Sequence, residues 1–247
     1  MKKGGIFVGI GGWTYAPWRG VFYPDDLVQR CELEYASRQL TSIEINGTYY
    51  STFKPANWAK WRDETPDGFV FSVKASRFCT NRKALGAAGD SIERFLGQGL
   101  DELGDRLGPI NWQFMGTKKF DADDMAAFLK LLPRELKKRP LRHALEVRHP
   151  SFKDPKFYDL ARRHNAAIVF ADHDDFPVIH EPTADFAYAR LMRAKESVKT
   201  GYRPAEIDGW AKQAKAWAKR GDAFVYFIAG AKERNPAAAQ ALIAKLS

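Results

Sequence analysis

Short apolar segments that favour strands alternate with amphipathic segments that favour helices along this chain of 247 residues. Each apolar segment is rich in β-branched or aromatic residues and is bounded by turn residues, which is typical of buried strands. These segments lie at residues 6–10, 42–45, 69–75, 110–114, 144–148, 167–171, 186–191 and 224–228. Eight such alternations predict a (β/α)8 barrel, in which parallel strands form a closed cylinder inside a ring of helices. We expect one domain over residues 1–247.

The segments between the strands repeat their apolar residues at helical spacing. We expect helices at residues 26–40, 90–107, 121–132, 154–165, 204–221 and 235–246. Asp154 followed by Pro155 is typical of a helix start, because a capping carboxylate often precedes a proline in the first turn. Residues 173–185 are rich in Pro, Asp and His and predict a long loop.

A doubly wound open sheet is the other fold that this alternation permits. Its dinucleotide fingerprint is missing, because "GIGGWT" places Thr14 where GxGxxG requires glycine. An aromatic loop follows instead of a helix, and no GK[ST] of a phosphate-binding loop occurs. The barrel is therefore favoured.

Polar side chains follow most of the predicted strands, at the end where barrel enzymes place their active sites. In "HALEVRHPSF" (143–152) an apolar run passes into Glu146 and Arg148, which share one face because strand side chains alternate. Applied to every strand, this alternation predicts two interior layers. Odd strands would supply Lys74, Glu146 or Arg148, and Arg190, and even strands Glu44 or Asn46, Gln113, and Asp172.

The strand ends predict a site at the barrel mouth. Glu146 and Glu44 are the candidate acid/base pair, and Lys74 is a third candidate catalytic residue, as a desolvated nucleophile. The candidate substrate-binding residues are Trp13, Tyr15, Trp18, Asn46, Tyr49, Gln113, Arg148, His149 and Arg190. Cations among these residues would hold an anion, and the aromatic loop 13–23 would cover the substrate.

Each candidate has a structural alternative. Glu146 with Arg190 or Lys74 would form a buried ion network that only braces the barrel. The aromatic loop 13–23 would cap the barrel mouth. His149 would only end its strand, and Lys74 would be an ordinary lysine paired with a carboxylate.

Lys and Arg number 39 against 30 Asp and Glu, so the formal charge is +9 and the pI about 9.5. This excess suits a small anionic or phosphorylated ligand or nucleic acid, and equally a solubilising surface. The two cysteines predict no disulfide framework and no zinc site, so we assign no metal ligand and expect a cytoplasmic protein. Glycines interrupt the apolar run of "MKKGGIFVGIGGW", so we expect no signal peptide. No run reaches the roughly 18 apolar residues of a membrane span.

The strand ends also carry a family resemblance. The ordered segments "GWTYAPWRGVFYP", "SIEINGTYY", "FVFSVKASRF", "LGPINWQF", "ALEVRHPSF" and "VYFIAGAKERNPAAAQALI" resemble the YecE-like family (domain of unknown function 72) over essentially the whole chain. The resemblance implies a (β/α)8 barrel and no particular reaction. Its motifs include every candidate site residue named above.

Three regions depart from the family pattern. Asn81 stands where the family usually has a histidine, and "RLMRAKE" replaces the usual "RLHG" after the seventh strand. Ile228 and Ala229 stand where the eighth strand usually ends in asparagines. A mechanism that needs that histidine or those amides is not expected here.

Three functions remain open. The leading hypothesis is a barrel enzyme of the hydrolase, isomerase or lyase class that acts on a phosphorylated or otherwise anionic substrate. The second is a nucleic-acid phosphoesterase resembling endonuclease IV-type barrels, and the third is a barrel that binds a ligand or partner without turnover. The sequence indicates no cofactor, leaves a divalent metal open, and does not give the oligomeric state.

Overall fold

Nine parallel strands form the main sheet of the computed structural model, which describes residues 4–247. They are β1 (Ile6–Gly11), β2 (Ser42–Ile45), β3 (Val70–Lys74), β4 (Leu107–Gln113), β7 (His143–Glu146), β8 (Ala166–Ile168), β9 (Phe170–Asp172), β10 (Ala187–Leu191) and β11 (Ala223–Phe227). A small antiparallel hairpin joins β5 (Glu135–Leu136) to β6 (Arg139–Pro140). Residues 1–3, the start of the N-terminal segment "MKKGGIFVGIGGW", lie outside the described residues.

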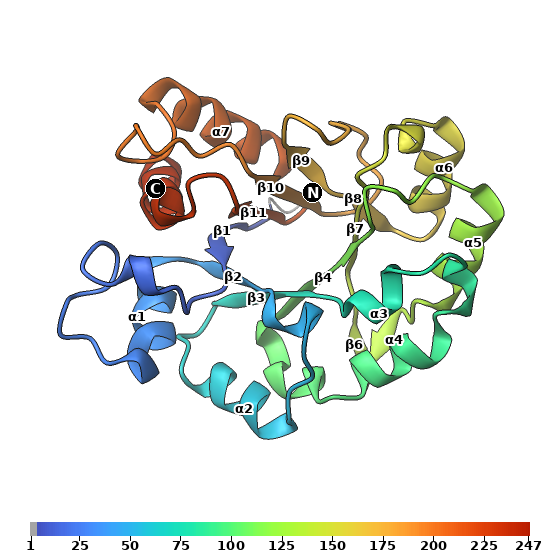
Figure 1. The fold of residues 1–247 in the computed structure, drawn as a ribbon, viewed down its shortest axis with the longest axis horizontal. Coiled ribbons are helices and arrows are strands. Elements are labelled where there is room, and N and C mark those ends of the chain that lie inside the picture. The colour runs from blue at the N-terminus through green and yellow to red at the C-terminus, as the bar shows by residue number, and fades with distance from the viewer. Residues whose placement is uncertain (1–3) are drawn as a thin grey trace.

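The sheet closes at β8 and β9, which are two halves of one strand interrupted at Val169. β8 pairs with β7 and β9 pairs with β10, so the first and last members of the sheet order meet in a single strand. The Val169 N–H donates to the Leu145 carbonyl at 3.0 Å, which continues the ladder across the interruption. Helices surround the strands (Figure 1), and the predicted (β/α)8 barrel is confirmed.

The helices are α1 (Glu32–Gln39), α2 (Pro55–Asp63), α3 (Arg77–Thr80), α4 (Gly89–Leu96), α5 (Ala122–Leu131), α6 (Pro155–Arg163), α7 (Pro204–Trp217) and α8 (Asn235–Leu246). Asp154 caps α6 as expected, accepting a hydrogen bond from the Lys156 N–H at 2.8 Å. The single helix predicted at 90–107 is wrong. α4 ends at Leu96 and a 3₁₀ helix starts after Gly99, whose φ of 106° is open mainly to glycine.

Short 3₁₀ helices and one long loop connect the remaining elements. The 3₁₀ helices are Ala16–Trp18, Gln29–Cys31, Gly47–Tyr49, Leu85–Ala87, Leu100–Arg106, Pro150–Phe152 and Lys232–Arg234. Residues 173–185 contain no helix or strand, in agreement with the predicted loop. Of the helices in residues 4–247, none is both long enough and apolar enough for a bilayer crossing.

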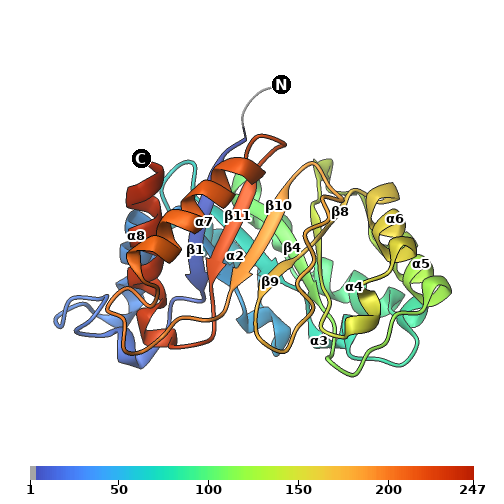
Figure 2. The ribbon, with the colours of Figure 1, turned by 90° about the horizontal axis from the view of Figure 1, so that it is seen from above.

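Apolar side chains fill both sides of the barrel wall. Outside it, helices such as α7 and α8 pack against β11 and β1 (Figure 2). The smaller cluster inside consists of Val70, Ala144, Ala167, Val169, Phe186, Tyr188, Phe224 and Tyr226. Two residues further along the strands from Ala144 and Tyr188, the inward positions hold Glu146 and Arg190. The barrel interior therefore changes from apolar to charged toward the C-terminal ends of the strands.

Candidate functional site

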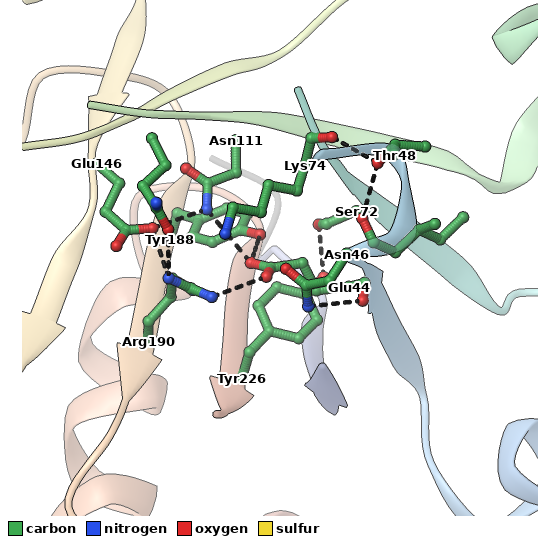
Figure 3. A network of polar contacts seen from close by, with 12 residues as sticks. Glu44, Asn46, Thr48, Ser72, Lys74, Asn111, Glu146, Tyr188, Arg190 and Tyr226 are labelled. Carbon is green, nitrogen blue, oxygen red and sulfur yellow. Dashed lines mark hydrogen bonds and ion pairs between the residues drawn. The ribbon is translucent and has the colours of Figure 1, made fainter. Parts of the chain in front are cut away.

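Arg190 on β10 lies between two carboxylates inside the barrel (Figure 3). Its Nη1 is 2.6 Å from Glu146 Oε2, and its Nη2 is 3.1 Å from Glu44 Oε1. All three side chains are buried. Buried charges are stable only when they are paired and hydrogen-bonded, so Arg190 holds the two glutamates in one charged cluster. This cluster joins β2, β7 and β10 across the barrel.

Two neutral side chains complete the cluster. The Tyr188 hydroxyl donates to Glu44 Oε2 at 2.5 Å, and Asn111 Nδ2 donates to Glu146 Oε2 at 3.0 Å. Asn111 Nδ2 also lies 3.4 Å from Glu44 Oε2. These bonds fix the orientation of both carboxylates.

The two interior layers expected from odd and even strands are not separate. Glu44 comes from the second strand, yet it bonds directly to Arg190 of the seventh. Layers in a barrel are adjacent along its axis, and an arginine side chain is long enough to reach the next layer. Asp172, expected in the same layer as Glu44, instead pairs with Arg193.

The charges of Glu146 and Arg190 are fixed near neutral pH. Burial disfavours the ionised form of Glu146, but the cations Arg190, Arg148 and Lys74 outweigh burial and lower its pKa to about 2. Burial likewise opposes the charge of Arg190, while Glu146 and Glu44 outweigh it and raise its pKa above the usual range. Glu146 therefore remains a carboxylate under ordinary conditions and cannot donate a proton there.

Lys74, the last residue of β3, differs from the arginines around it. Lys74 is 8% exposed, and its Nζ lies 4.2 Å from the centre of the Tyr49 ring. Among the ion pairs of residues 4–247 there is none that involves Lys74. Burial and the neighbouring Arg190 lower its pKa to about 8, although Glu146 and Glu44 act in the opposite direction. A fraction of Lys74 is therefore an unprotonated amine at neutral pH.

Arg148 lies just beyond β7 and is more exposed than Lys74 and Arg190. Its Nη2 donates to Glu146 Oε1 and to Gln113 Oε1, both at 2.7 Å. The Phe176 ring, from the loop 173–185, stacks 4.5 Å from its guanidinium carbon and 3.9 Å from the His173 ring. The Arg148 side chain is 23% exposed, so part of the guanidinium is open to a ligand.

Two buried polar atoms of the cluster lack a protein partner. Within residues 4–247, no hydrogen bond satisfies Asn111 Oδ1 or Arg190 Nε. Buried polar atoms are normally hydrogen-bonded, so such atoms are usual where a water or a ligand binds.

Tyr49, Asn46 and His149 occupy the rim. The Tyr49 hydroxyl accepts a hydrogen bond from Asn81 Nδ2 at 3.0 Å, which holds the ring beneath Lys74. Asn46 Nδ2 donates to the Glu44 carbonyl at 3.3 Å. His149 Nδ1 accepts from the Ser151 N–H at 3.1 Å, so it caps the 3₁₀ helix after β7 and fits its structural alternative.

The aromatic side chains of the loop 13–23 pack against the protein, while several smaller residues between them are exposed. Trp18 is buried, and its Nε1 donates to the Lys232 carbonyl at 3.0 Å. The Trp13 ring packs edge-on against Trp61 with 5.2 Å between centroids. Tyr15 lies under the Lys232 ammonium, whose Nζ is 4.0 Å above its ring. These contacts fit a structural cap, and contact of this loop with a substrate stays a prediction.

Asn111 and Tyr188 are the interior residues that the sequence analysis missed. Each lies two positions before an assigned residue, Asn111 before Gln113 and Tyr188 before Arg190. The same period-two alternation that selected the assigned pair therefore marks them as well. Both residues lie one inward position before the strand ends, where the candidate site residues were assigned.

A cavity of about 840 Å³ opens beside the mouth, between the ends of β9 and β10 and helix α7. Arg193 lines it and forms ion pairs with Asp172 and, at 3.1 Å, with Asp174. In the described part of the chain, no group of three or more His, Cys, Asp or Glu side chains is arranged to hold a metal ion.

Solved structures share this fold. A DUF72 family protein from Thermotoga maritima MSB8 is 24% identical, with a TM-score of 0.75 and coverage of 97% of both chains. A DUF72 family protein from Enterococcus faecalis V583 is 16% identical, with a TM-score of 0.73 and coverage of 99% of both chains. The SacUVDE structure is 10% identical, with a TM-score of 0.57 and coverage of 98% of both chains. At these identities, the likenesses establish the fold alone.

The family assignment rests on a family model, and sequence relatives agree with it. The UPF0759 protein YecE of Escherichia coli K12 is 29% identical over 150 residues, which are 60% of this chain and half the length of that protein. The UPF0759 protein YunF of Bacillus subtilis 168 is 26% identical over 216 residues, 84% of this chain and 73% of that protein. The family described as "Protein of unknown function DUF72" matches residues 7–247. The chain therefore belongs to the DUF72 family, which confirms the family resemblance of its strand ends.

Proposed function

We propose that this protein is a barrel enzyme that binds a small phosphorylated or otherwise anionic substrate at the C-terminal mouth of its strands. The observation that carries this proposal is an excess of positive charge at the mouth. Lys74, Arg148 and Arg190 face the two carboxylates of Glu44 and Glu146, and Lys74 takes part in no ion pair among residues 4–247. An anion would neutralise the remaining charge and would contact Arg148 and Lys74 first, because Arg190 is enclosed.

The contacts and pKa values of these residues suggest a different role for each. Glu146 has a pKa of about 2, so in this proposal it positions Arg190 and Arg148 rather than exchanging protons. Lys74 has a pKa of about 8 and is the group suited to accept a proton or attack a substrate near neutral pH. Glu44 and Arg190 lie deeper in the barrel and, in this proposal, hold Glu146 in its orientation. Proton transfer or addition at carbon fits this arrangement, which favours an isomerase or lyase over a hydrolase.

Thermal unfolding in phosphate at constant ionic strength tests the proposal. A ligand that binds only the folded state raises Tm with the logarithm of its concentration. Wild type should show this rise, and Arg148→Met should lose most of it. Arg162→Met is the control, because Arg162 is a half-exposed arginine of α6 that also pairs with carboxylates. Equal shifts in wild type and Arg148→Met would remove the mouth as the anion site.

Arg190→Met is a poorer probe of the same site. Its removal would leave the buried carboxylates of Glu44 and Glu146 without their common partner, so lost binding could not be told from lost folding. A ligand that binds at Arg148 but is unchanged after long incubation would support the third hypothesis, a binding barrel without turnover.

One surface feature favours nucleic acid as a second candidate ligand. Tyr50 and Phe78, next to the mouth, are 67% and 62% exposed. The Arg77 guanidinium carbon lies 5.9 Å from the Tyr50 ring centre and 5.4 Å from that of Phe78. Exposed aromatic rings beside an arginine suit the stacking of single-stranded bases. Fluorescence anisotropy with a labelled oligonucleotide across a salt series tests this candidate, which requires Phe78→Ala to weaken binding at every salt concentration.

A further inference from the structure

We propose that Lys74 forms a covalent imine with a carbonyl group of the substrate, which makes the substrate class small anionic aldehydes, ketones or keto acids. This inference rests on the proposed function and deepens it. It concerns the cation of the buried Glu44, Glu146 and Arg190 cluster that takes part in no ion pair among residues 4–247.

The neighbouring arginines explain why Lys74 is available. Arg190 satisfies Glu44 and Glu146, and Arg148 satisfies the second oxygen of Glu146. The carboxylates are thereby held by guanidinium groups, so neither forms an ion pair with the lysine. On its other side the Lys74 amine has the face of the Tyr49 ring at 4.2 Å. An amine held between an aromatic face and engaged carboxylates can reach a substrate without first breaking a salt bridge.

The position of Lys74 suits a nucleophile. It is the last residue of β3, at the end of the barrel where substrates enter. The buried Thr48 hydroxyl donates to the Lys74 carbonyl at 2.5 Å, which fixes the end of the strand. Its pKa of about 8 leaves roughly a tenth of the amine unprotonated at pH 7, far more than an ordinary lysine provides. The unprotonated amine is the form that attacks a carbonyl carbon.

The step balances without a further reagent. The nitrogen lone pair of Lys74 forms a bond to the carbonyl carbon, and the carbonyl π electrons move to oxygen, which takes up a proton. The resulting carbinolamine then loses its hydroxyl group, with a second proton, as water. Overall the ammonium and the carbonyl compound give a protonated imine and one water, and the two hydrogens of that water come from the ammonium.

The surrounding charges suit this product. The protonated imine carries the same single positive charge as the ammonium, so Glu44 and Glu146 keep the charge that they stabilised before. The anionic group of the substrate would lie against Arg148, the cation that is partly exposed. An imine cation withdraws electrons from the adjacent carbon, which allows a C–H or C–C bond there to break and fits the isomerase or lyase class.

Reductive trapping tests the inference. The full-length protein is incubated with dihydroxyacetone phosphate and sodium cyanoborohydride, which reduces an imine to a stable secondary amine, and peptide mass spectrometry locates the label. We expect Lys74 to be labelled at least about tenfold faster than the exposed lysines at pH 7.5. Lys232 is the internal control, because it also lies over aromatic rings at the mouth but away from the two glutamates. Lys74→Arg should abolish the label at this position and keep the protein folded, because it retains the charge.

The uncharged probe dihydroxyacetone separates the two proposals. If Lys74 is trapped by both probes, and Arg148→Met slows trapping with the phosphate probe alone, both proposals are supported. If phosphate binds at Arg148 but Lys74 is labelled no faster than Lys232, the imine is overturned and the anion site stands. If Lys74 is trapped equally by both probes and Arg148→Met changes neither rate, the imine is supported and the anion function is overturned.

Discussion

Arg190 keeps two buried glutamates together that would otherwise repel each other. Glu146→Leu removes the partner of Arg190 Nη1 and of Arg148, so we expect it to lower the free energy of unfolding by about 3–5 kcal/mol. Arg190→Met should lower the free energy of unfolding by a similar amount, because no cation then lies between the carboxylates of Glu44 and Glu146 to offset their repulsion. In the double variant Glu146→Leu/Arg190→Met, the loss of unfolding free energy should be clearly smaller than the sum of the two single losses. Both members of the ion pair are then absent, so neither remains as an unpaired buried charge. Urea unfolding of the four proteins measures this coupling.

An exposed ion pair provides the control for that cycle. Arg139 pairs with the exposed Asp105 at the surface. Asp105→Asn should change the free energy of unfolding far less than either Glu146→Leu or Arg190→Met, because exposed pairs contribute little. Additive losses in the Glu146 and Arg190 cycle would contradict the bracing role that we assign to Arg190.

Lys74 should reduce the stability of the protein near neutral pH. An ordinary lysine has a pKa of 10.5, and burial lowers that of Lys74 to about 8 in the folded protein. The folded state therefore holds this proton less tightly than the unfolded chain, which costs stability below about pH 8 and ceases to do so as the pH rises to about 10.5. We expect Lys74→Met to be more stable than wild type by on the order of 1–3 kcal/mol at pH 7.

The pH dependence distinguishes this effect from better packing. The advantage of Lys74→Met should shrink between pH 8 and about 10.5, as the wild-type lysine loses its proton in both states. Urea midpoints at four or five pH values measure the difference. A constant advantage over this range would mean that the charge of Lys74 is not what costs stability. A reactive group kept at a cost in stability is common at functional sites.

At the scale of the elements, strand positions could be predicted better than their interruptions. Each strand segment has enough β-branched and aromatic residues to be recognised locally. The interruption at Val169 arises because β8 pairs with β7 and β9 with β10, a long-range arrangement that no local pattern records. The helix α2 was not among the expected helices. Only Trp58 is buried in it, so it lacks the apolar repeat by which helices are recognised.

Gly9 in β1 lies where the backbones of β1 and β2 approach each other closely. A Cβ added to Gly9 would lie 1.8 Å from the Ser42 carbonyl oxygen, because β1 and β2 approach closely there. We therefore expect Gly9→Ala to lower the melting temperature strongly or to prevent folding, since backbone atoms on both strands would have to move. Circular dichroism melting measures the loss.

A second glycine controls for the intrinsic effect of alanine. A Cβ added to Gly116 would have nothing within 4 Å, and its backbone φ is not positive. Gly116→Ala should be neutral or slightly stabilising, because it only restricts the unfolded chain. Similar losses in both variants would show that the close approach of β1 and β2 is not the cause.

At the scale of the whole molecule, strand alternation predicted the charged members of the interior cluster but not which of them pair. Alternation placed Glu44, Lys74 and Arg190 inside, because direction within a strand follows from period two. Which of them meet depends on the stagger of the strands around the barrel and on side-chain length. For that reason the sequence could not predict that Lys74 forms no ion pair among residues 4–247, or that Arg190 is enclosed.

The interior charges should also set how the barrel responds to acid. Glutamate ordinarily has a pKa of 4.5, and the cations around Glu146 outweigh its burial and lower the folded value to about 2. The ionised form is thus favoured in the folded state, so its contribution is complete above about pH 4.5 and is lost as the pH falls toward 2. This contribution amounts to about 3 kcal/mol. Protonation would also raise the net charge above +9 and add general repulsion.

Glu146→Gln isolates the share of the acid response that belongs to this one carboxylate. The variant is similar in shape and cannot ionise, so it should be less stable than wild type at pH 6, with a difference that closes between about pH 4.5 and 2. Surface carboxylates and the overall charge respond to acid almost equally in both proteins and cancel in the comparison. Urea unfolding from pH 6 to pH 2 measures both curves. Parallel curves would show that Glu146 is not held ionised by Arg190 and its neighbours, and the fixed-charge cluster on which the proposed site depends would have to be abandoned.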